Sequence, residues 1–163
     1  MAVSDATWED YGALCDCFTI GGTKNGMLFG EALVITNPNL MPSFRRCMKQ
    51  QGAILAKGRL FGVQYCAALE NDLYMELARQ SIATAQQLSA GLKALNISML
   101  IDSPSNQLFP VFPNEVIEKL KEEVSFEFWS TVDDDHSCIR FVTAWHTTHE
   151  EVKGLLSLLE GMV

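Results

Sequence analysis

The sequence lacks a long apolar run, and none of its apolar stretches approaches the length that spans a membrane. It also lacks a secretory signal at its start. Residues 1–10 contain neither the basic n-region nor the apolar h-region of a signal peptide. These two absences argue against a membrane-embedded or secreted protein, so we expect a cytoplasmic one.

Basic residues are in the minority. The 163 residues include 12 Lys or Arg against 20 Asp or Glu, giving a net charge of −8. No basic stripe with interleaved aromatic residues occurs, which argues against nucleic-acid binding. Apolar residues make up 48% and charged residues 20%, so the composition is that of a globular protein with a core, without repeats or low-complexity tracts.

Cysteine motifs are missing as well. The five cysteines contain no CxxC pair, and no further metal ligands lie near them at zinc-site spacing, so we expect no metal. Cys15 and Cys17 are expected on one face of a strand, which is packing geometry. Free and mostly buried thiols in a reducing compartment are the expected state.

The apolar patterning predicts alternating helices and strands. Helices are expected at 6–14 (capped by Asp5 or Thr7), 40–51 (Pro42 in its first turn), 53–70, 72–95, 114–123 and 149–161 (capped by Thr147 or Thr148). Strands are expected at 15–20, 27–35, 97–101, 107–111, 125–131 and 138–143. Helix 53–70 has few charges, so it should be buried or packed against a second subunit.

The order of these elements predicts an α/β fold in two parts. From about residue 72 they form a compact α+β module with helices on one face of a small sheet. The first 40 residues resemble the end of a larger sheet whose earlier strands lie outside this chain. We therefore expect residues 1–70 to be the end of a large domain with connecting helices, and residues 71–163 to be a small C-terminal α+β domain.

One lysine is placed where it could do chemistry. Lys24 lies in the glycine-flanked turn 21–26, between two apolar runs. A lysine whose pKa is lowered by burial or by a cationic neighbour can form a Schiff base with an aldehyde such as pyridoxal phosphate. Alternatively, the turn is a hairpin connector and Lys24 a solvated charge. The spacing of a phosphate-binding P-loop is absent.

Four blocks, taken together, resemble one known family. They are Gly-Gly-Thr-Lys-Asn-Gly-x-x-x-Gly-Glu-Ala at 21–32, Lys-Gln-x-Gly-Ala-x-x-Ala-Lys-Gly at 49–58, Asp-Ser-Pro-Ser-Asn-Gln-Leu-Phe-Pro at 102–110 and Ile-Arg-Phe-Val-Thr-Ala-Trp at 139–145. From about residue 10 to its C-terminus the chain resembles the low-specificity threonine aldolases and related β-eliminating lyases. These are pyridoxal-phosphate enzymes of the aspartate-aminotransferase fold, known as fold type I.

The resemblance implies a set of cofactor contacts. Lys24 matches the lysine that binds pyridoxal phosphate covalently. Lys57, with Arg59 as the second choice, matches basic residues near the cofactor phosphate, often contributed by a neighbouring subunit. The loop that presents Lys24 would be shaped by Gly21, Gly22 and Thr23. On the residues alone, Lys57 could instead extend from a buried helix with its amine in solvent.

The resemblance also implies substrate contacts. Arg140 matches an arginine that holds the substrate α-carboxylate, a task suited to a planar bidentate donor. Asn106 would bond the substrate or hold its own loop. From the residues alone, Arg140 could be an ion-pair partner of the turn 133–135, and Asn106 an ordinary turn residue. The family's active-site histidine matches none of His136, His146 and His149, which are expected to be solvated.

One part of the family pattern has no counterpart here. The phosphate turn, the ring that stacks on the cofactor and the aspartate that pairs with its pyridine nitrogen precede the family's lysine by more residues than this chain has before Lys24. Asp5, Asp10 and Asp16 are therefore poor candidates for that aspartate. The expected activity is cleavage of β-hydroxy-α-amino acids such as threonine, in a homo-oligomer or with a complementing N-terminal half. The alternatives are β-elimination from another amino acid and a non-catalytic oligomerisation module.

Overall fold

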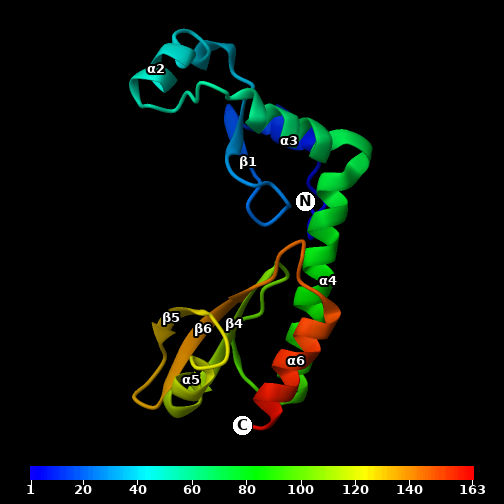
Figure 1. Ribbon diagram of the computed structural model, residues 1–163, viewed down its shortest axis with the longest axis vertical. Coiled ribbons are helices and arrows are strands. Elements are labelled where there is room, and N and C mark those ends of the chain that lie inside the picture. The colour runs from blue at the N-terminus through cyan, green and yellow to red at the C-terminus, as the bar shows by residue number, and fades with distance from the viewer. The chain divides into compact units, whose positions relative to one another are not determined.

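A computed structural model describes residues 1–163. The fold is mixed α/β, as predicted, and forms two compact units, Met1–Leu77 (unit 1) and Ala78–Val163 (unit 2). The boundary lies inside the 22-residue helix α4, Leu73–Ala94 (Figure 1). The domain boundary after residue 70 stays a prediction. No helix is both long enough and apolar enough to cross a membrane.

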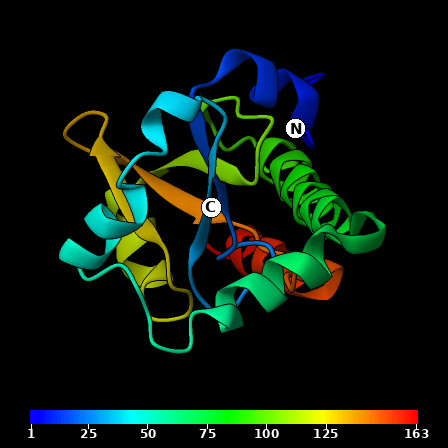
Figure 2. The same ribbon diagram turned by 90° about the horizontal axis from the view of Figure 1, so that it is seen from above.

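Unit 1 begins with helix α1, Trp8–Leu14, capped by Thr7. Thr7 and Asp10 form a reciprocal capping box, so the predicted cap at Thr7 is confirmed. Strand β1, Cys17–Gly21, pairs antiparallel with strand β2, Glu31–Ile35, and the two run side by side in Figure 2. Cys15 is the C-cap of α1 and not a strand residue, so the expected shared strand face with Cys17 is wrong.

Left-handed backbone conformations break several predicted elements in unit 1. Gly26 and Gly30 have φ values of 84° and 87°, so residues 27–30 form a loop and β2 starts only at Glu31. Ser43 has a φ of 62°, and the predicted helix 40–51 is therefore split. A 3₁₀ turn, η1, covers Pro38–Leu40, and helix α2 covers Phe44–Gln50, so Pro42 precedes the helix.

Helix α3, Arg59–Leu69, is shorter than predicted and largely exposed. Only Tyr65 and Ala68 of this helix are buried, so of the two predicted alternatives burial within the chain is wrong, and packing against a second subunit stays a prediction. A 3₁₀ turn, η2, covers Glu70–Asp72 and leads into α4. The core of unit 1 is small and consists of Ile20, Met27, Tyr65 and Ala68, with partly buried apolar side chains around them.

Unit 2 has the predicted order of elements after the start of α4. Strands β3 (Met99–Ile101) and β4 (Gln107–Pro113), helix α5 (Asn114–Leu120), strands β5 (Glu127–Thr131) and β6 (His136–Val142) and helix α6 (His149–Glu160) follow one another. The strands form one antiparallel sheet in the order β3-β4-β6-β5. Thr148 caps α6 in a capping box with Glu151, so this predicted cap is confirmed.

The helices of unit 2 share one face of this sheet, as predicted. Leu108 and Phe112 of β4 and Ile139 and Phe141 of β6 form a single core with side chains of α4, α5 and α6. Helix α6 lies beside α4 (Figures 1 and 2), and the two meet at Gly91 and Leu156. Because strand side chains alternate between faces, residue 140 projects from the face opposite the helices.

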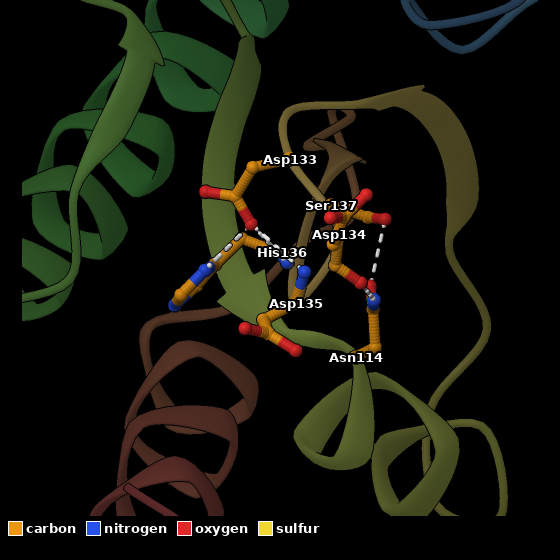
Figure 3. A network of polar contacts seen from close by, with 6 residues as sticks. All are labelled: Asn114, Asp133, Asp134, Asp135, His136 and Ser137. Carbon is orange, nitrogen blue, oxygen red and sulfur yellow. Dashed lines mark hydrogen bonds and ion pairs between the residues drawn. The ribbon is translucent and has the colours of Figure 1, made fainter.

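The turn between β5 and β6 is fixed by a polar network (Figure 3). Asp133 Oδ1 accepts hydrogen bonds from the backbone N–H groups of Asp135 and His136, and lies 3.0 Å from His136 Nδ1. Asn114, at the start of α5, donates from Nδ2 to the carbonyl oxygen of Asp134, and the hydroxyl of Ser137 donates to Asn114 Oδ1. The turn is thereby tied to α5.

The cysteines are free, but they are not mostly buried as predicted. Only Cys138 is buried, where burial raises the pKa of its thiol. Cys17, Cys47 and Cys66 are exposed, and Cys15 is intermediate. The prediction followed the general tendency of free cysteine to be buried, whereas three of the four cysteines of unit 1 lie on its exposed surface.

Candidate functional site

The turn that carries Lys24 is closed by its own backbone. The N–H groups of Asn25 and Met27 both donate to the carbonyl oxygen of Gly22, at 2.9 and 3.2 Å. Gly26 supplies the left-handed conformation that completes the turn. The side chain of Lys24 is exposed and makes no hydrogen bond or ion pair, so its amine is open to a ligand.

Two tyrosines hold this turn from the helices next to it. The Tyr74 hydroxyl donates to the carbonyl oxygen of Gly21 at 2.7 Å, and Asn25 Nδ2 donates back to the carbonyl oxygen of Tyr74 at 3.0 Å. The Tyr65 hydroxyl lies 2.8 Å from the carbonyl oxygen of Ile20 and 3.2 Å from that of Gly30. One hydroxyl proton serves both carbonyls, so Tyr65 joins the end of β1 to the start of β2.

Burial raises the pKa of both tyrosines, and the proximity of Tyr65 raises that of Tyr74 further. Both hydroxyls are therefore kept protonated and remain donors. Sequence reasoning missed these two residues. Tyr65 and Tyr74 lie 45 and 53 residues from their carbonyl partners in the chain, and nothing in the local pattern links them.

Close packing requires a glycine at position 22. A Cβ atom at this position would lie 2.6 Å from Cβ of Met27 and 2.9 Å from the Tyr65 hydroxyl. At Gly21 the nearest atom to such a Cβ would be 4.0 Å away, so there is room for a side chain. Thr23 is exposed beside Lys24. The absence of a side chain at Gly22 thus lets Tyr65 and Met27 pack directly against the turn.

Lys57, the expected contact of the cofactor phosphate, lies outside the helix 53–70 in which the sequence pattern places it. Lys57 is in an exposed turn, Gly58 is the N-cap of α3, and Arg59 is its first residue. The alternative in which Lys57 extends from a buried helix is therefore wrong. Gly58 offers no side-chain cap to α3, but the N–H groups of Leu60 and Phe61 already donate to the carbonyl oxygens of Lys57 and Gly58, so mainly the positive dipole end of this helix N-terminus favours an anion.

Arg140 lies in unit 2, on the sheet face opposite the helices. Its Nη1 donates to Gln107 Oε1 at 3.0 Å, and its Nη2 forms an ion pair with Glu127. Its Cζ lies 5.5 Å from the centroid of the Trp129 ring, a cation–π arrangement. The ion pair with the turn 133–135, considered from sequence, is wrong because Asp133 is bonded to His136 and Arg140 to Glu127.

Asn106 holds its own loop. Its side-chain Nδ2 donates to the carbonyl oxygen of Thr143 at 2.8 Å, and its carbonyl oxygen accepts from the N–H of Thr143. Thr143 in turn donates from its hydroxyl to the carbonyl oxygen of Ser81. Of the two roles expected for Asn106, holding the loop is thus visible, and contact with substrate stays a prediction.

The carboxylates that precede Lys24 have other partners. Asp10 accepts hydrogen bonds from Thr7 in the capping box, which lowers the pKa of its carboxyl. Asp16 Oδ1 accepts from Asn37 Nδ2 at 2.9 Å. Asp10 and Asp16 therefore have local structural roles, and whether either contacts a cofactor stays a prediction.

Comparison with known proteins places these features in a context. No family model matches the chain. Low-specificity L-threonine aldolases of a Pseudomonas species and of Pseudomonas aeruginosa are 29% and 27% identical to it. These alignments cover 98% and 93% of this chain but 45% and 42% of the two relatives. The chain thus spans slightly less than half the length of the curated relatives it matches.

A solved structure of Leishmania major threonine aldolase is also similar, with a TM-score of 0.92 and 38% sequence identity. The match covers 96% of this chain and 46% of that one. The predicted resemblance is therefore confirmed. This chain is similar in sequence to the C-terminal part of the low-specificity threonine aldolases and has the same mixed α/β fold.

Proposed function

We propose that a protein containing this chain is a pyridoxal-phosphate-dependent carbon–carbon lyase that cleaves β-hydroxy-α-amino acids, such as threonine, to glycine and an aldehyde. The observation that carries the proposal is the similarity to threonine aldolases along almost the whole chain. The unpaired Lys24 amine on a braced turn supports it. We propose the activity for this chain together with the remaining half of its relatives' length, which we call the complete enzyme.

The residues present fit the cofactor where they can be tested. Pyridoxal phosphate carries an aldehyde and a phosphate, and the exposed, unpaired amine of Lys24 suits the first. The exposed ammonium of Lys57, just before the start of α3, suits the second. Gly22 and Thr23 would border the bound cofactor. When bound, the cofactor would supply an electron sink for the breaking Cα–Cβ bond.

The chain's own residues would bind and orient the reactants. Lys24 would attach the cofactor through Nζ and yield it to the amino group of the substrate. Arg140 would bind the substrate α-carboxylate and so fix the orientation of the Cα–Cβ bond. Tyr65 and Tyr74 would keep the backbone below Lys24 in place. We expect the remaining cofactor contacts to come from the rest of the complete enzyme and from other copies in an oligomer.

A second candidate function rests on the exposed apolar surface of unit 1. Leu60 and Val63 of α3 are 52% and 63% exposed, and Leu28, in the loop before β2, is 86% exposed. An apolar surface of this kind is typical of an interface with another polypeptide. A non-catalytic oligomerisation module would use it without any chemistry at Lys24. β-Elimination from another amino acid is the alternative within the same cofactor class.

The proposed function is tested by locating the cofactor. We expect the complete enzyme, reduced with borohydride in the presence of pyridoxal phosphate and digested, to carry the cofactor mass on the Lys24 peptide. Lys24→Ala should remove this adduct, the visible absorbance of the bound cofactor and nearly all cleavage of threonine. Lys153→Ala is the matched control, since Lys153 is an exposed lysine on α6. Cleavage that survives Lys24→Ala would overturn the assignment, and a complete enzyme that binds no cofactor would favour the oligomerisation module.

A further inference from the structure

Two of the five N–H donors of the Arg140 guanidinium, one on each terminal nitrogen, are already used within the chain. Both terminal nitrogens have acceptors, since Nη1 donates to Gln107 and Nη2 pairs with Glu127. Nε is buried and has no hydrogen-bond acceptor. A carboxylate that takes two parallel bonds from Arg140 must therefore use at least one terminal nitrogen that already donates to another side chain.

The two existing acceptors differ in charge. Gln107 is neutral, whereas Glu127 carries the same carboxylate group as an amino-acid substrate. Glu127 lies directly opposite Arg140 in the β5–β6 register, and their side chains are 67% and 24% exposed. The ion pair neutralises the charge of Arg140. An incoming carboxylate therefore meets a neutral pair in which Glu127 is the more exposed member.

We propose that Glu127 is an internal competitor of the substrate: it occupies Arg140 until the α-carboxylate of an amino acid takes its place. This inference rests on the proposed role of Arg140. Exchange is feasible because the Glu127 side of the pair is 67% exposed and is weakened by solvent, and exposed ion pairs contribute up to about fivefold to an equilibrium constant. Gln107 and Trp129 contact Arg140 from β4 and β5 and can hold its plane while Glu127 leaves.

The exchange makes Glu127 a determinant of amino-acid affinity. An amino acid must displace the Glu127 carboxylate to pair with Arg140, whereas an amine without a carboxylate leaves that pair intact. The structure thus assigns to Glu127 a lowered affinity for amino acids and no effect on binding of their decarboxylated analogues. Removing its charge should strengthen amino-acid binding, which is the opposite of what loss of a purely structural contact does.

The test is Glu127→Gln, which removes the charge and preserves the shape. In the complete enzyme we expect the KM for threonine to fall about two- to fivefold, the range of an exposed ion pair. Glu127→Ala, which also removes the amide, should act in the same direction. Glu118→Gln is the matched control, because Glu118 on α5 is 70% exposed, close to the 67% of Glu127, and pairs with Lys121, the C-cap of that helix; it should leave KM unchanged.

A second measurement needs neither cofactor nor activity. In the 163-residue chain, the NMR signals of the Arg140 Nε–H and the Trp129 indole N–H are followed during titration with glycine or with ethanolamine, which lacks the carboxylate. We expect glycine to shift both signals, with a midpoint about two- to fivefold lower in Glu127→Gln than in the wild type. Ethanolamine should have no effect.

The outcomes separate this inference from the proposed function. If Arg140→Lys leaves KM and the glycine response intact, Arg140 does not bind the substrate carboxylate, and the role of Glu127 falls with it. If Arg140→Lys weakens both but Glu127→Gln raises KM or leaves it unchanged, only the inference about Glu127 is overturned, and Glu127 is a structural partner of Arg140.

Discussion

The hydroxyl of Tyr74 donates a 2.7 Å hydrogen bond to the carbonyl oxygen of Gly21, three residues before Lys24. Tyr65 makes the equivalent contact one residue earlier, with Ile20. The turn that presents Lys24 is therefore held by the backbone preceding it and by Asn25 following it. Lys24 contributes nothing to this bracing, so its side chain is free for chemistry while its Cα position is fixed.

Removing either hydroxyl should loosen the Lys24 turn. A net intramolecular hydrogen bond is worth about 1 kcal/mol, so Tyr65→Phe and Tyr74→Phe should each lower the free energy of unfolding by about that amount. Tyr11→Phe is the control, because Tyr11 contacts Phe18 through its ring and its hydroxyl makes no hydrogen bond. Urea denaturation measures all three. Equal loss in all three variants would mean that the hydroxyl contacts do not brace the turn.

Adding one methyl group at Gly22 should be costly. The new Cβ would clash with Met27 and with the Tyr65 hydroxyl, and relieving such overpacking costs about 1–3 kcal/mol. Gly12→Ala is the matched comparison, because Gly12 lies within α1 with no atom within 4 Å of the added Cβ. That substitution should stabilise the chain by about 0.5–1 kcal/mol. Chemical denaturation of the pair gives both values, and a Gly22→Ala chain as stable as the wild type would contradict the close packing.

The Asp133 network predicts a pH dependence of stability (Figure 3). Hydrogen bonds, first from the Asp135 N–H and then from His136, hold the pKa of the Asp133 carboxyl below its ordinary value. A carboxyl whose pKa is lowered on folding stabilises the protein above its unfolded pKa, and this contribution is lost as the pH falls through the folded pKa. Asp133→Asn should therefore lower the Tm at pH 7, and the difference should shrink below about pH 4.

The control for this prediction is the next residue. Asp134 uses its backbone carbonyl oxygen to accept from Asn114, and its side chain makes no hydrogen bond. Asp134→Asn should therefore leave the Tm nearly unchanged across the same pH range. If the Tm deficit of Asp133→Asn were as large in acid as at pH 7, the stabilisation would not depend on the charged carboxylate.

Much of unit 2 could be predicted from the sequence, because its signals are local. The long apolar stripe of α4 and the Thr148 cap of α6 specify those helices, and the turn residues separate the strands. Unit 1 was predicted less well. Ser43 and Gly30 have left-handed backbone conformations that no apolar pattern indicates, so helix 40–51 and strand 27–35 were both drawn too long.

The candidate site shows the same difference between residues that local sequence indicates and residues that only the fold brings together. Lys24 stands out through its glycine-flanked turn and Arg140 through the resemblance, and both are properties of short stretches. Their partners depend on the fold. Glu127 meets Arg140 only through the β5–β6 register, and Tyr74 reaches Gly21 across 53 residues. The ion pair considered for Arg140 from the sequence involves the wrong carboxylate. The acidic turn nearest in sequence contains Asp133, which pairs with His136, whereas Arg140 pairs with Glu127.

The small core under Lys24 has a consequence for local unfolding. A pair of strands on its own is marginally stable in water, and β1 and β2 rely on a few buried side chains, whereas the sheet of unit 2 covers a core drawn from three helices. Segments with few buried contacts open at lower free energy than the rest of a chain. The Lys24 turn therefore belongs to the part of the chain that opens most readily, and any ligand that binds only its closed form will stabilise that part by mass action.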